Sequence, residues 1–162
     1  MTDQQKKFID LAVIHLKKYD EISKILNTDR KVFSAWWKEL KEEREAIAKV
    51  KSIWLGKFKN TNFWNFYNWY ISHERKCHYC GITENEIKTL LENKRLYTKR
   101  IKTRGKTLEL ERKQPDLKYD NLENLTFSCY WCNNAKTDTF TDKEFIEVGK
   151  VFSKIWQQRL TR

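Results

Sequence analysis

The sequence of 162 residues contains no long hydrophobic run, and none of its segments approaches the roughly 18 uninterrupted apolar residues of a membrane-spanning helix. Its first residues, Met1-Thr-Asp-Gln-Gln-Lys-Lys, lack the apolar core of a signal peptide. Internal repeats and low-complexity tracts are absent as well. These absences argue against a membrane or secreted protein, so we expect a soluble, cytoplasmic chain with no membrane partner.

Cysteine is also sparse, with four residues arranged as two Cys-x-x-Cys pairs, Cys77/Cys80 and Cys129/Cys132. Stable disulfides are unusual in the reducing interior of a cell. The two pairs therefore predict one tetrahedral zinc site with four cysteine ligands. Such a site would offset the small apolar core available to a chain of this length. The alternative is a redox-active or disulfide-bonded pair.

Acidic residues are in the minority. The 33 Lys and Arg residues outnumber the 22 Asp and Glu residues, and the net charge of +11 attracts polyanions without specifying which. Between residues 94 and 106 acidic residues are absent. A solvated charged face would usually mix the two signs, so this stretch favours a phosphate-tracking surface. The DNA-binding residues that we expect here are Lys99, Arg100, Lys102 and Arg104.

Residues 1–52 show apolar side chains at helical spacing, which predicts three helices. The first covers residues 4–18, the second is a shorter helix containing Ile22, and the turn-forming Asn27-Thr28-Asp29 precedes the third. The apolar stripe of the third helix consists of Val32, Ala35, Trp36 and Leu40. This order predicts a helix-turn-helix.

The third helix would turn its polar residues toward a DNA major groove. These residues are Arg30, Lys31, Ser34 and Lys38. The alternative is a three-helix bundle that only packs on the rest of the chain. Residues 53–75 then predict an aromatic connecting helix, because Phe63, Phe66, Tyr67 and Tyr70 recur at helical spacing after a break at Gly56.

From residue 76 to residue 162 the periodicity changes. A short helix is expected after Thr83, and Leu108 and Leu110 alternate with glutamates as in a half-buried strand. Arg104-Gly105 would turn this strand back on an earlier one at residues 97–102. A brief strand at 125–127 leads into the second cysteine pair and a helix, and a capping box at 141–144 opens a last helix. The predicted fold class is α+β, mainly helical.

One group of residues gives this order a specific meaning. The motif positions are Glu111-Arg112, Asn124-Leu125 and Cys129-x-x-Cys132-Asn133-x-x-Lys136. With them, residues 76–140 resemble the HNH endonucleases, whose ββα-metal site has the same order. Within that superfamily the likeness is greatest to members with a four-cysteine zinc site, such as HNH restriction endonucleases of the PacI type.

The resemblance implies a metal-dependent endonuclease that hydrolyses phosphodiester bonds of double-stranded DNA. Glu111 and Asn133 are similar to the ligands of the catalytic divalent cation, for which Mg²⁺ is a suitable hard ion. Asn124 matches the residue that ties the polar loop to the catalytic strand. The four cysteines match the structural zinc site, and Lys136 is expected to contact DNA.

One motif position departs from the family, because Arg112 stands where a histidine activates the attacking water. A guanidinium cannot accept a proton near neutral pH, so Arg112 is expected to clamp a phosphate oxygen and to stabilise the transition state. Another group must then act as the base, or the cation must activate water alone. The candidates are Tyr79, whose pKa a nearby metal and arginine could lower, His78, His73 and Glu109.

Two interpretations of the function remain open at this point. In the first, the chain is an HNH endonuclease of a prokaryotic or phage type, acting in restriction, homing or junction resolution. The helix-turn-helix favours sequence-directed binding, since a resolvase reads branch shape. A single ββα-metal site cuts one strand, so double-strand cleavage needs a homodimer or sequential nicking. In the second interpretation, the chain is a non-catalytic, zinc-stapled DNA-binding protein with a degenerate site.

Overall fold

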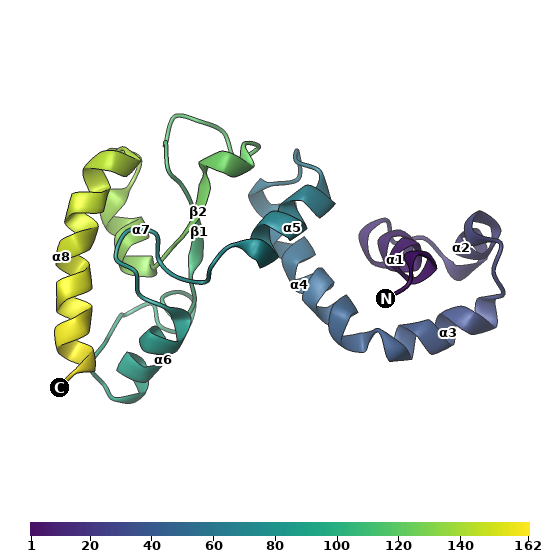
Figure 1. Ribbon diagram of the computed structural model, residues 1–162, viewed down its shortest axis with the longest axis horizontal. Coiled ribbons are helices and arrows are strands. Elements are labelled where there is room, and N and C mark those ends of the chain that lie inside the picture. Colours follow the sequence, from purple (N-terminus) through teal and green to yellow (C-terminus); the bar gives the residue numbers. More distant parts are fainter. The chain divides into compact units, whose positions relative to one another are not determined.

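Helices dominate the computed structural model, which describes all 162 residues (Figure 1). The chain forms two compact units, Met1–Tyr70 and Ile71–Arg162. The first unit is helical, and the second adds a two-stranded sheet to its helices. The predicted α+β, mainly helical class is therefore confirmed. The division predicted at residues 52 and 75 stays a prediction. No helix is long and apolar enough to cross a lipid bilayer.

The first unit begins with α1 (Asp3–Ile9), which a capping box between Thr2 and Gln5 opens and which runs into a π-helical turn, η1 (Asp10–Ile14). Phe8 is fully buried and stacks on Phe33, with 5.0 Å between the ring centroids. Leu16 continues the helical spacing of apolar residues in this segment, but it is 74% exposed, because the chain leaves the helix there with a positive φ of 53°.

Helices α2 (Tyr19–Leu26) and α3 (Arg30–Glu39) are joined by the three predicted turn residues. Asn27 takes the left-handed conformation that ends α2, and the Asp29 carboxylate accepts from the Lys31 N–H at 2.8 Å to open α3. The core residue of α3 is Phe33, whereas Ala35 of the expected stripe is exposed. A helix-turn-helix assignment for these two helices stays a prediction.

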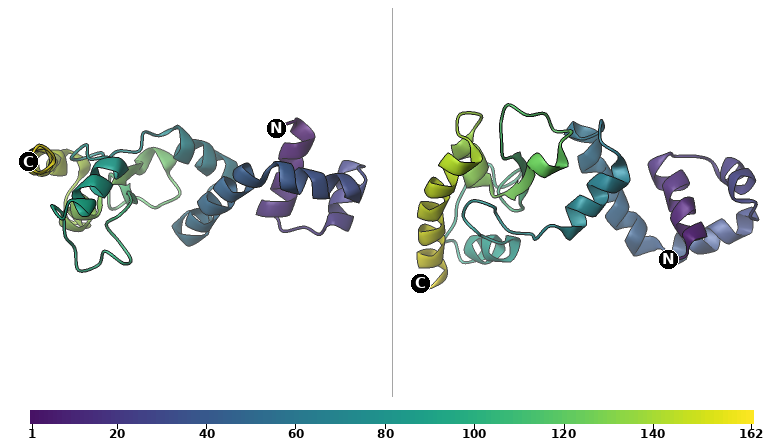
Figure 2. Two further views of the ribbon diagram at one scale, coloured as in Figure 1. Left: turned by 90° about the horizontal axis from the view of Figure 1, so that it is seen from below. Right: turned by 45° about the horizontal axis from the view of Figure 1, so that its top comes forward.

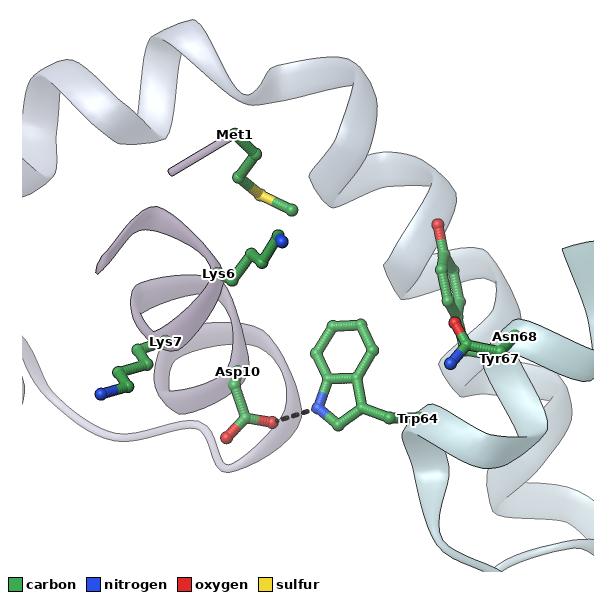
Figure 3. A pocket seen from close by; sticks show the side chains of 7 residues that line it. All are labelled: Met1, Lys6, Lys7, Asp10, Trp64, Tyr67 and Asn68. Atoms are coloured by element: carbon green, nitrogen blue, oxygen red, sulfur yellow. Dashed lines mark hydrogen bonds between the residues drawn. The ribbon is translucent and has the colours of Figure 1, made fainter. Parts of the chain in front are cut away.

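A change of backbone direction at Leu40 separates α3 from α4 (Lys41–Lys57), which buries Ile47 and Val50. Gly56 lies within α4, and the helix ends one residue later than the expected break. The aromatic helix is α5 (Phe63–Ser72). Trp64 of α5 donates its indole N–H to the Asp10 carboxylate at 2.7 Å, which joins α5 to the first helical segment (Figure 3).

The second unit contains α6 (Glu84–Glu92), β1 (Glu109–Arg112), a 3₁₀ turn η2 (Leu122–Asn124), β2 (Leu125–Ser128), α7 (Tyr130–Lys136) and α8 (Asp142–Leu160). Strands β1 and β2 are antiparallel, with Glu109 opposite Ser128 and Arg112 opposite Leu125. Helix α7 follows β2 directly and contacts β1, so the order is strand, loop, strand, helix. Figure 2 shows the long α8 alongside α7 from two further directions.

The predicted hairpin between residues 97–102 and β1 is wrong. The partner of β1 is β2, and residues 97–102 form loop and turns. Leu96 and Thr98 are buried, and the Leu96 N–H donates to the Leu90 carbonyl of α6 at 3.1 Å. The segment before Gly105 therefore packs against a helix and leaves the edge of β1 to β2. Arg104-Gly105 does form a bend, and Gly105 has a positive φ of 89°.

Helix α8 lies very close to the first cysteine pair. A Cβ atom added at Gly149 would stand 2.4 Å from the Tyr79 carbonyl oxygen, so only glycine permits this approach. Phe145, one turn earlier, is buried and packs edge-on against the Tyr79 ring, with 5.1 Å between centroids. The packing of α8 therefore fixes the backbone around Tyr79.

Candidate functional site

The four cysteines come together in the core of the second unit. All are buried, and their sulfur atoms lie within 4.8 Å of one another. The sulfur atoms of Cys80 and Cys129, one from each pair, are 3.7 Å apart. Tetrahedral zinc with Zn–S bonds of about 2.3 Å separates its sulfur ligands by about 3.8 Å. The donor set and spacing therefore fit a structural zinc ion.

A tight turn, a contact with β2 and a helix cap hold the four sulfur atoms in position. In the first pair, Gly81 adopts a positive φ of 74° and its N–H donates to the Cys77 carbonyl at 2.8 Å, which closes a tight turn. The His78 N–H donates to the Phe127 carbonyl of β2 at 2.8 Å. In the second pair, Cys129 caps α7 and its sulfur accepts from the Cys132 N–H. The cluster thus joins a loop, a strand and a helix.

The electrostatics of the cluster favour an anionic sulfur. Hydrogen bonds from Cys129, Cys132 and Cys80 would stabilise a Cys77 thiolate and hold the pKa of Cys77 far below its usual range. Thiolates are the form of cysteine that ligates metals. The hydrogen bond from Cys129 raises the pKa of Cys132, so a bound cation would be needed to make all four sulfurs anionic. A lowered cysteine pKa occurs in metal sites and in redox-active pairs, and the convergence of four sulfurs on one point favours the metal site.

Glu111 of β1 is a buried carboxylate whose pKa is influenced by the charges of Lys136, Arg112 and Asp138. It is only 8% exposed, and burial is the largest cause that raises its pKa, opposed by the positive charge of Lys136. The Lys136 ammonium stands 3.7 Å from the Glu111 carboxylate and donates to the Arg112 carbonyl at 3.1 Å. Lys136 is fully buried, so the prediction that it contacts DNA is not met in this structure. Its contacts instead fix the end of β1.

The side chain of Asn133 in α7 contacts β1 at Glu109, whereas the family resemblance places Asn133 with Glu111. Its amide Nδ2 donates to Glu109 at 2.6 Å, and Arg104 binds both oxygens of Glu109. Because a carboxylate only accepts hydrogen bonds, this contact orients the Asn133 amide and leaves its oxygen as the atom that can ligate a cation. Glu109 therefore positions Asn133, and Arg104, expected at a DNA surface, is engaged with Glu109.

Asn124 spans the loop between the two strands. Its amide accepts from the Gln114 N–H at 2.8 Å and donates to the Gln114 carbonyl at 3.0 Å, while its own carbonyl accepts from the Lys113 N–H at 2.7 Å. Asn124 is buried, so these bonds form where water competes weakly. The residue holds the loop against the end of β1, as the family resemblance implies.

Arg112 is held on three sides. Its guanidinium donates to Asp138 at 2.8 Å and to the Leu117 carbonyl at 3.1 Å, and it lies over the Tyr119 ring, 4.6 Å from the centroid. The Nε atom is buried and has no hydrogen-bond partner. An orphaned buried donor is unusual in a folded protein and is characteristic of positions that a ligand completes.

Tyr79 and His78 occupy different environments. The Tyr79 ring is buried and its hydroxyl has no partner. Burial, followed by the carboxylates of Asp142 and Glu111, raises the pKa of Tyr79, which is the opposite of the lowered pKa expected for a base. His78 is partly exposed, and its Nε2 lies 2.8 Å from an Asp142 carboxylate oxygen. His73 is exposed.

A cavity of about 270 Å³ opens beside these groups. It is lined by residues of the polar loop and by the first residue of α8: Lys113, Gln114, Leu117, Asn121, Glu123, Asn124 and Asp142. The sequence indicated Asp142 only as part of a helix cap. Its contact with His78 spans 64 positions of the chain, and no local signal predicts such a pair.

The remaining predicted DNA-binding residues lie at the surface. On α3 the exposed residues are Arg30, Lys31, Ser34 and Lys38, and in the second unit they are Lys99, Arg100 and Lys102. Arg30 is paired with Asp20 at 2.6 Å, which partly neutralises it. Exposure leaves these side chains available to a partner.

Among solved structures, the chain is similar to PacI, described as a rare-cutting HNH restriction endonuclease that exhibits an extraordinary mechanism of DNA perturbation. The two share 26% sequence identity, and the match covers 71% of this chain and 79% of the PacI chain with a TM-score of 0.51. This chain has an HNH fold. The likeness supports a DNA nuclease at the level of the family. Comparisons with protein-family models and with curated protein sequences gave no match.

Proposed function

We propose that the chain is a metal-dependent endonuclease that hydrolyses phosphodiester bonds of double-stranded DNA in a sequence-directed manner. One observation carries the proposal. Beside the buried carboxylate of Glu111, two buried donors, Tyr79 Oη and Arg112 Nε, have no partner in the protein. Glu111 influences the pKa of Tyr79, and Arg112 influences the pKa of Glu111, so both donors lie within electrostatic reach of this carboxylate. A phosphate bound beside Glu111 would supply the acceptor that Arg112 Nε lacks.

Glu111 and the oriented amide oxygen of Asn133 are the proposed ligands of the catalytic cation. Carboxylate and amide oxygens suit Mg²⁺ or a similar hard ion, which would polarise the scissile phosphate and neutralise charge in the transition state. Glu109 holds the Asn133 amide, and Asn124 holds the loop that follows β1. Glu109 and Asn124 therefore hold other groups in place and take no direct part in the chemical step.

Arg112 takes the role of a phosphate clamp. The guanidinium is permanently charged, and its contacts with Asp138 and Leu117 occupy only part of its five donors. Its unpaired Nε is free to donate to a nonbridging phosphate oxygen, where it would stabilise the charge that builds up as the P–O bond breaks.

For the base we propose His78 over Tyr79. The hydrogen bond between His78 and Asp142 supports this assignment, because a carboxylate partner orients an imidazole and stabilises the imidazolium that forms when it takes a proton. Tyr79 lacks such a partner, and its raised pKa opposes deprotonation. Target choice is assigned to α3, whose exposed Lys31 and Lys38 would enter a major groove.

A nicking assay tests the enzymatic activity. Supercoiled plasmid with Mg²⁺ should be nicked by the parent protein, and Glu111→Ala should slow nicking by about a hundredfold or more because a cation ligand is removed. Glu92→Ala, an exposed carboxylate of α6, serves as the matched control and should cleave at the parental rate. If the parent protein binds DNA but does not nick it, whichever divalent metal is supplied, the result would instead support the zinc-stapled binding protein.

A second pair of variants separates the two candidate bases. His78→Gln should reduce the rate constant for nicking by about 10² to 10⁴. Tyr79→Phe should have a much smaller effect, since it removes a hydroxyl without a proton-accepting role. The reverse ranking, with Tyr79→Phe as the inactive variant, would contradict the assignment of His78.

A further inference from the structure

The C-terminal end of α8 borders a cavity of about 430 Å³ that the proposed chemistry does not use. Figure 1 shows this end of α8 beside α6, and the two helices are in contact. Four cations, one exposed tyrosine and one buried leucine line the cavity, which we name the α8 basic pocket: Lys94, Arg95, Leu96, Tyr97, Arg159 and Arg162. None of the lining residues is acidic.

The backbone on one side of the α8 basic pocket is anchored. Lys94 adopts a left-handed conformation with φ 55° just after α6. The next two N–H groups, of Arg95 and Leu96, both donate to the Leu90 carbonyl, at 2.8 and 3.1 Å. Leu96 is 5% exposed and fixes the segment to the core. The basic side chains of this segment therefore project from a defined position.

Arg95 and Arg159 hydrogen-bond to each other's backbone, and no carboxylate neutralises either side chain. Arg95 donates to the carbonyl of Arg159 at 3.1 Å, and Arg159 donates to the carbonyl of Arg95 at 3.2 Å. Carbonyl groups are neutral, and none of the four cations forms an ion pair with a carboxylate. The pocket therefore concentrates uncompensated positive charge, and each guanidinium retains free donors for a ligand.

Helix α8 sets the distance between the pocket and the candidate active site. Asp142, its first residue, lines the cavity beside Asn124, and Arg159 lies 17 residues further along the helix. At a rise of about 1.5 Å per residue the separation is about 26 Å. One DNA strand advances about 3.4 Å per nucleotide, so a duplex that lies along α8 would cover this length with about eight base pairs.

We propose that the α8 basic pocket is a second DNA-binding site, which binds a backbone phosphate about eight base pairs from the bond that is cut. The planar guanidinium groups match phosphate oxygens in geometry and charge. The inference rests on the proposed nuclease function and adds to it a site that lengthens the DNA footprint of the second unit. The pocket contributes to affinity and leaves the chemical step unchanged.

The test uses the full chain and two double variants. Lys94→Gln/Arg162→Gln removes two exposed cations of the pocket without touching the bonds between Arg95 and Arg159. Lys88→Gln/Lys150→Gln removes the same charge from α6 and α8 outside the pocket, at lysines already paired with glutamates. Melting temperatures establish that both variants fold as the parent does.

Affinity for a 30-base-pair duplex is measured with Ca²⁺ in place of Mg²⁺ over a range of salt concentrations. The pocket variant should lower the slope of log Kd against log salt by about 0.9 for each phosphate that it no longer neutralises, and the control should keep the parental slope. With Mg²⁺, the pocket variant should raise KM for nicking this duplex at unchanged kcat. On a duplex of about six base pairs, which is shorter than the separation of the two sites, its KM should equal that of the parent.

Equal slopes for the parent and the pocket variant, or equal decreases in the pocket and control variants, would overturn the second DNA-binding site. A lower kcat in the pocket variant would overturn the claim that the pocket acts on affinity alone. These results are distinct from a failure of the proposed function, in which the parent protein nicks no DNA with any divalent metal. A parent that binds no duplex contradicts both proposals.

Discussion

At the level of single residues, the candidate site depends on how each buried polar group is partnered. Glu111 and Lys136 are both buried and face each other, and Asn124 satisfies three backbone bonds of its loop. Asn133 is oriented by Glu109. Trp156 of α8 also has a buried donor without a partner, so this property alone does not define a site. We assign Tyr79 Oη and Arg112 Nε to the substrate because both residues lie within electrostatic reach of Glu111.

The buried charge of Glu111 predicts a cost to stability at neutral pH. Its folded-state pKa lies above the usual 4.5, so the favourable contribution of the neutral acid is present below that value and is lost as the pH rises through the folded pKa. In Mg²⁺-free buffer, Glu111→Gln should therefore melt at a higher temperature than the parent. The gap should widen as the pH is raised from about 5 to about 8.

Thermal unfolding of both proteins at matched pH values measures this difference. A gap that narrows with rising pH would mean that the carboxylate is stabilised by folding, contrary to the direction of its pKa shift. The same shift predicts that nicking with Mg²⁺ falls at acidic pH, because a protonated Glu111 cannot ligate a cation.

At the scale of elements, α8 and the cysteine pairs hold the strands and α7 in place. The close approach of Gly149 to Tyr79 makes this position sensitive to a single methyl group. Gly149→Ala should destabilise the protein by about 1–3 kcal/mol, because the new Cβ meets a backbone carbonyl that cannot move aside. Urea-induced unfolding, followed by tryptophan fluorescence, provides the measurement.

Gly56→Ala is the matched control for that variant. Gly56 lies within α4 and has nothing within 4 Å of an added Cβ, so alanine should stabilise the helix by about 0.5–1 kcal/mol. The two substitutions are chemically identical, so the opposite signs expected for the change in the free energy of unfolding come from packing alone. If Gly149→Ala destabilised the protein no more than Gly56→Ala does, the close contact between α8 and the first cysteine pair would be contradicted.

Removal of zinc should affect the second unit as a whole. Structural zinc sites contribute about 10–16 kcal/mol in small peptides, which is comparable to the total stability of a domain. The protein should contain one zinc ion per chain, and a strong chelator should unfold the unit formed by Ile71–Arg162. Elemental analysis and circular dichroism, before and after zinc is added back, report on this effect. An unchanged melting temperature in the chelated protein would contradict a structural role.

At the scale of the whole molecule, one candidate nuclease site occurs per chain. A single ββα-metal site cuts one strand, so supercoiled plasmid should accumulate as the open circle before linear DNA forms. A time course on agarose gels, at several protein concentrations, tests this order. Linear DNA from the first time point, with a steep dependence on protein concentration, would instead indicate a homodimer that cuts both strands together.

Several features could be predicted because their signals are local in the sequence. The capping boxes of α6 and α8, the turn before α3 and the two cysteine pairs each involve residues a few positions apart. The HNH resemblance also rests on short motifs around Glu111, Asn124 and Asn133. Hydrogen-bonding geometry and metal-ligand spacing constrain such segments whatever the rest of the chain does.

The errors concern contacts between distant segments. The sequence predicts that β1 pairs with residues 97–102 across a bend, whereas the structure pairs it with β2 and anchors Leu96 on α6. It placed Lys136 at a DNA surface and gave Tyr79 a lowered pKa, whereas both are buried. Burial and pairing depend on the whole three-dimensional environment, which single-residue patterns do not encode.

Short-range spacing in the sequence is enough to predict a four-cysteine cluster suited to zinc, a mainly helical α+β fold and the motif residues of an HNH site. Strand pairing, the burial of Lys136 and the contact between Asp142 and His78 follow from the three-dimensional packing of distant segments. This packing also assembles the α8 basic pocket from two segments more than sixty residues apart. Such contacts form only when the core closes around them, since their free energy depends on neighbours that the linear sequence does not specify.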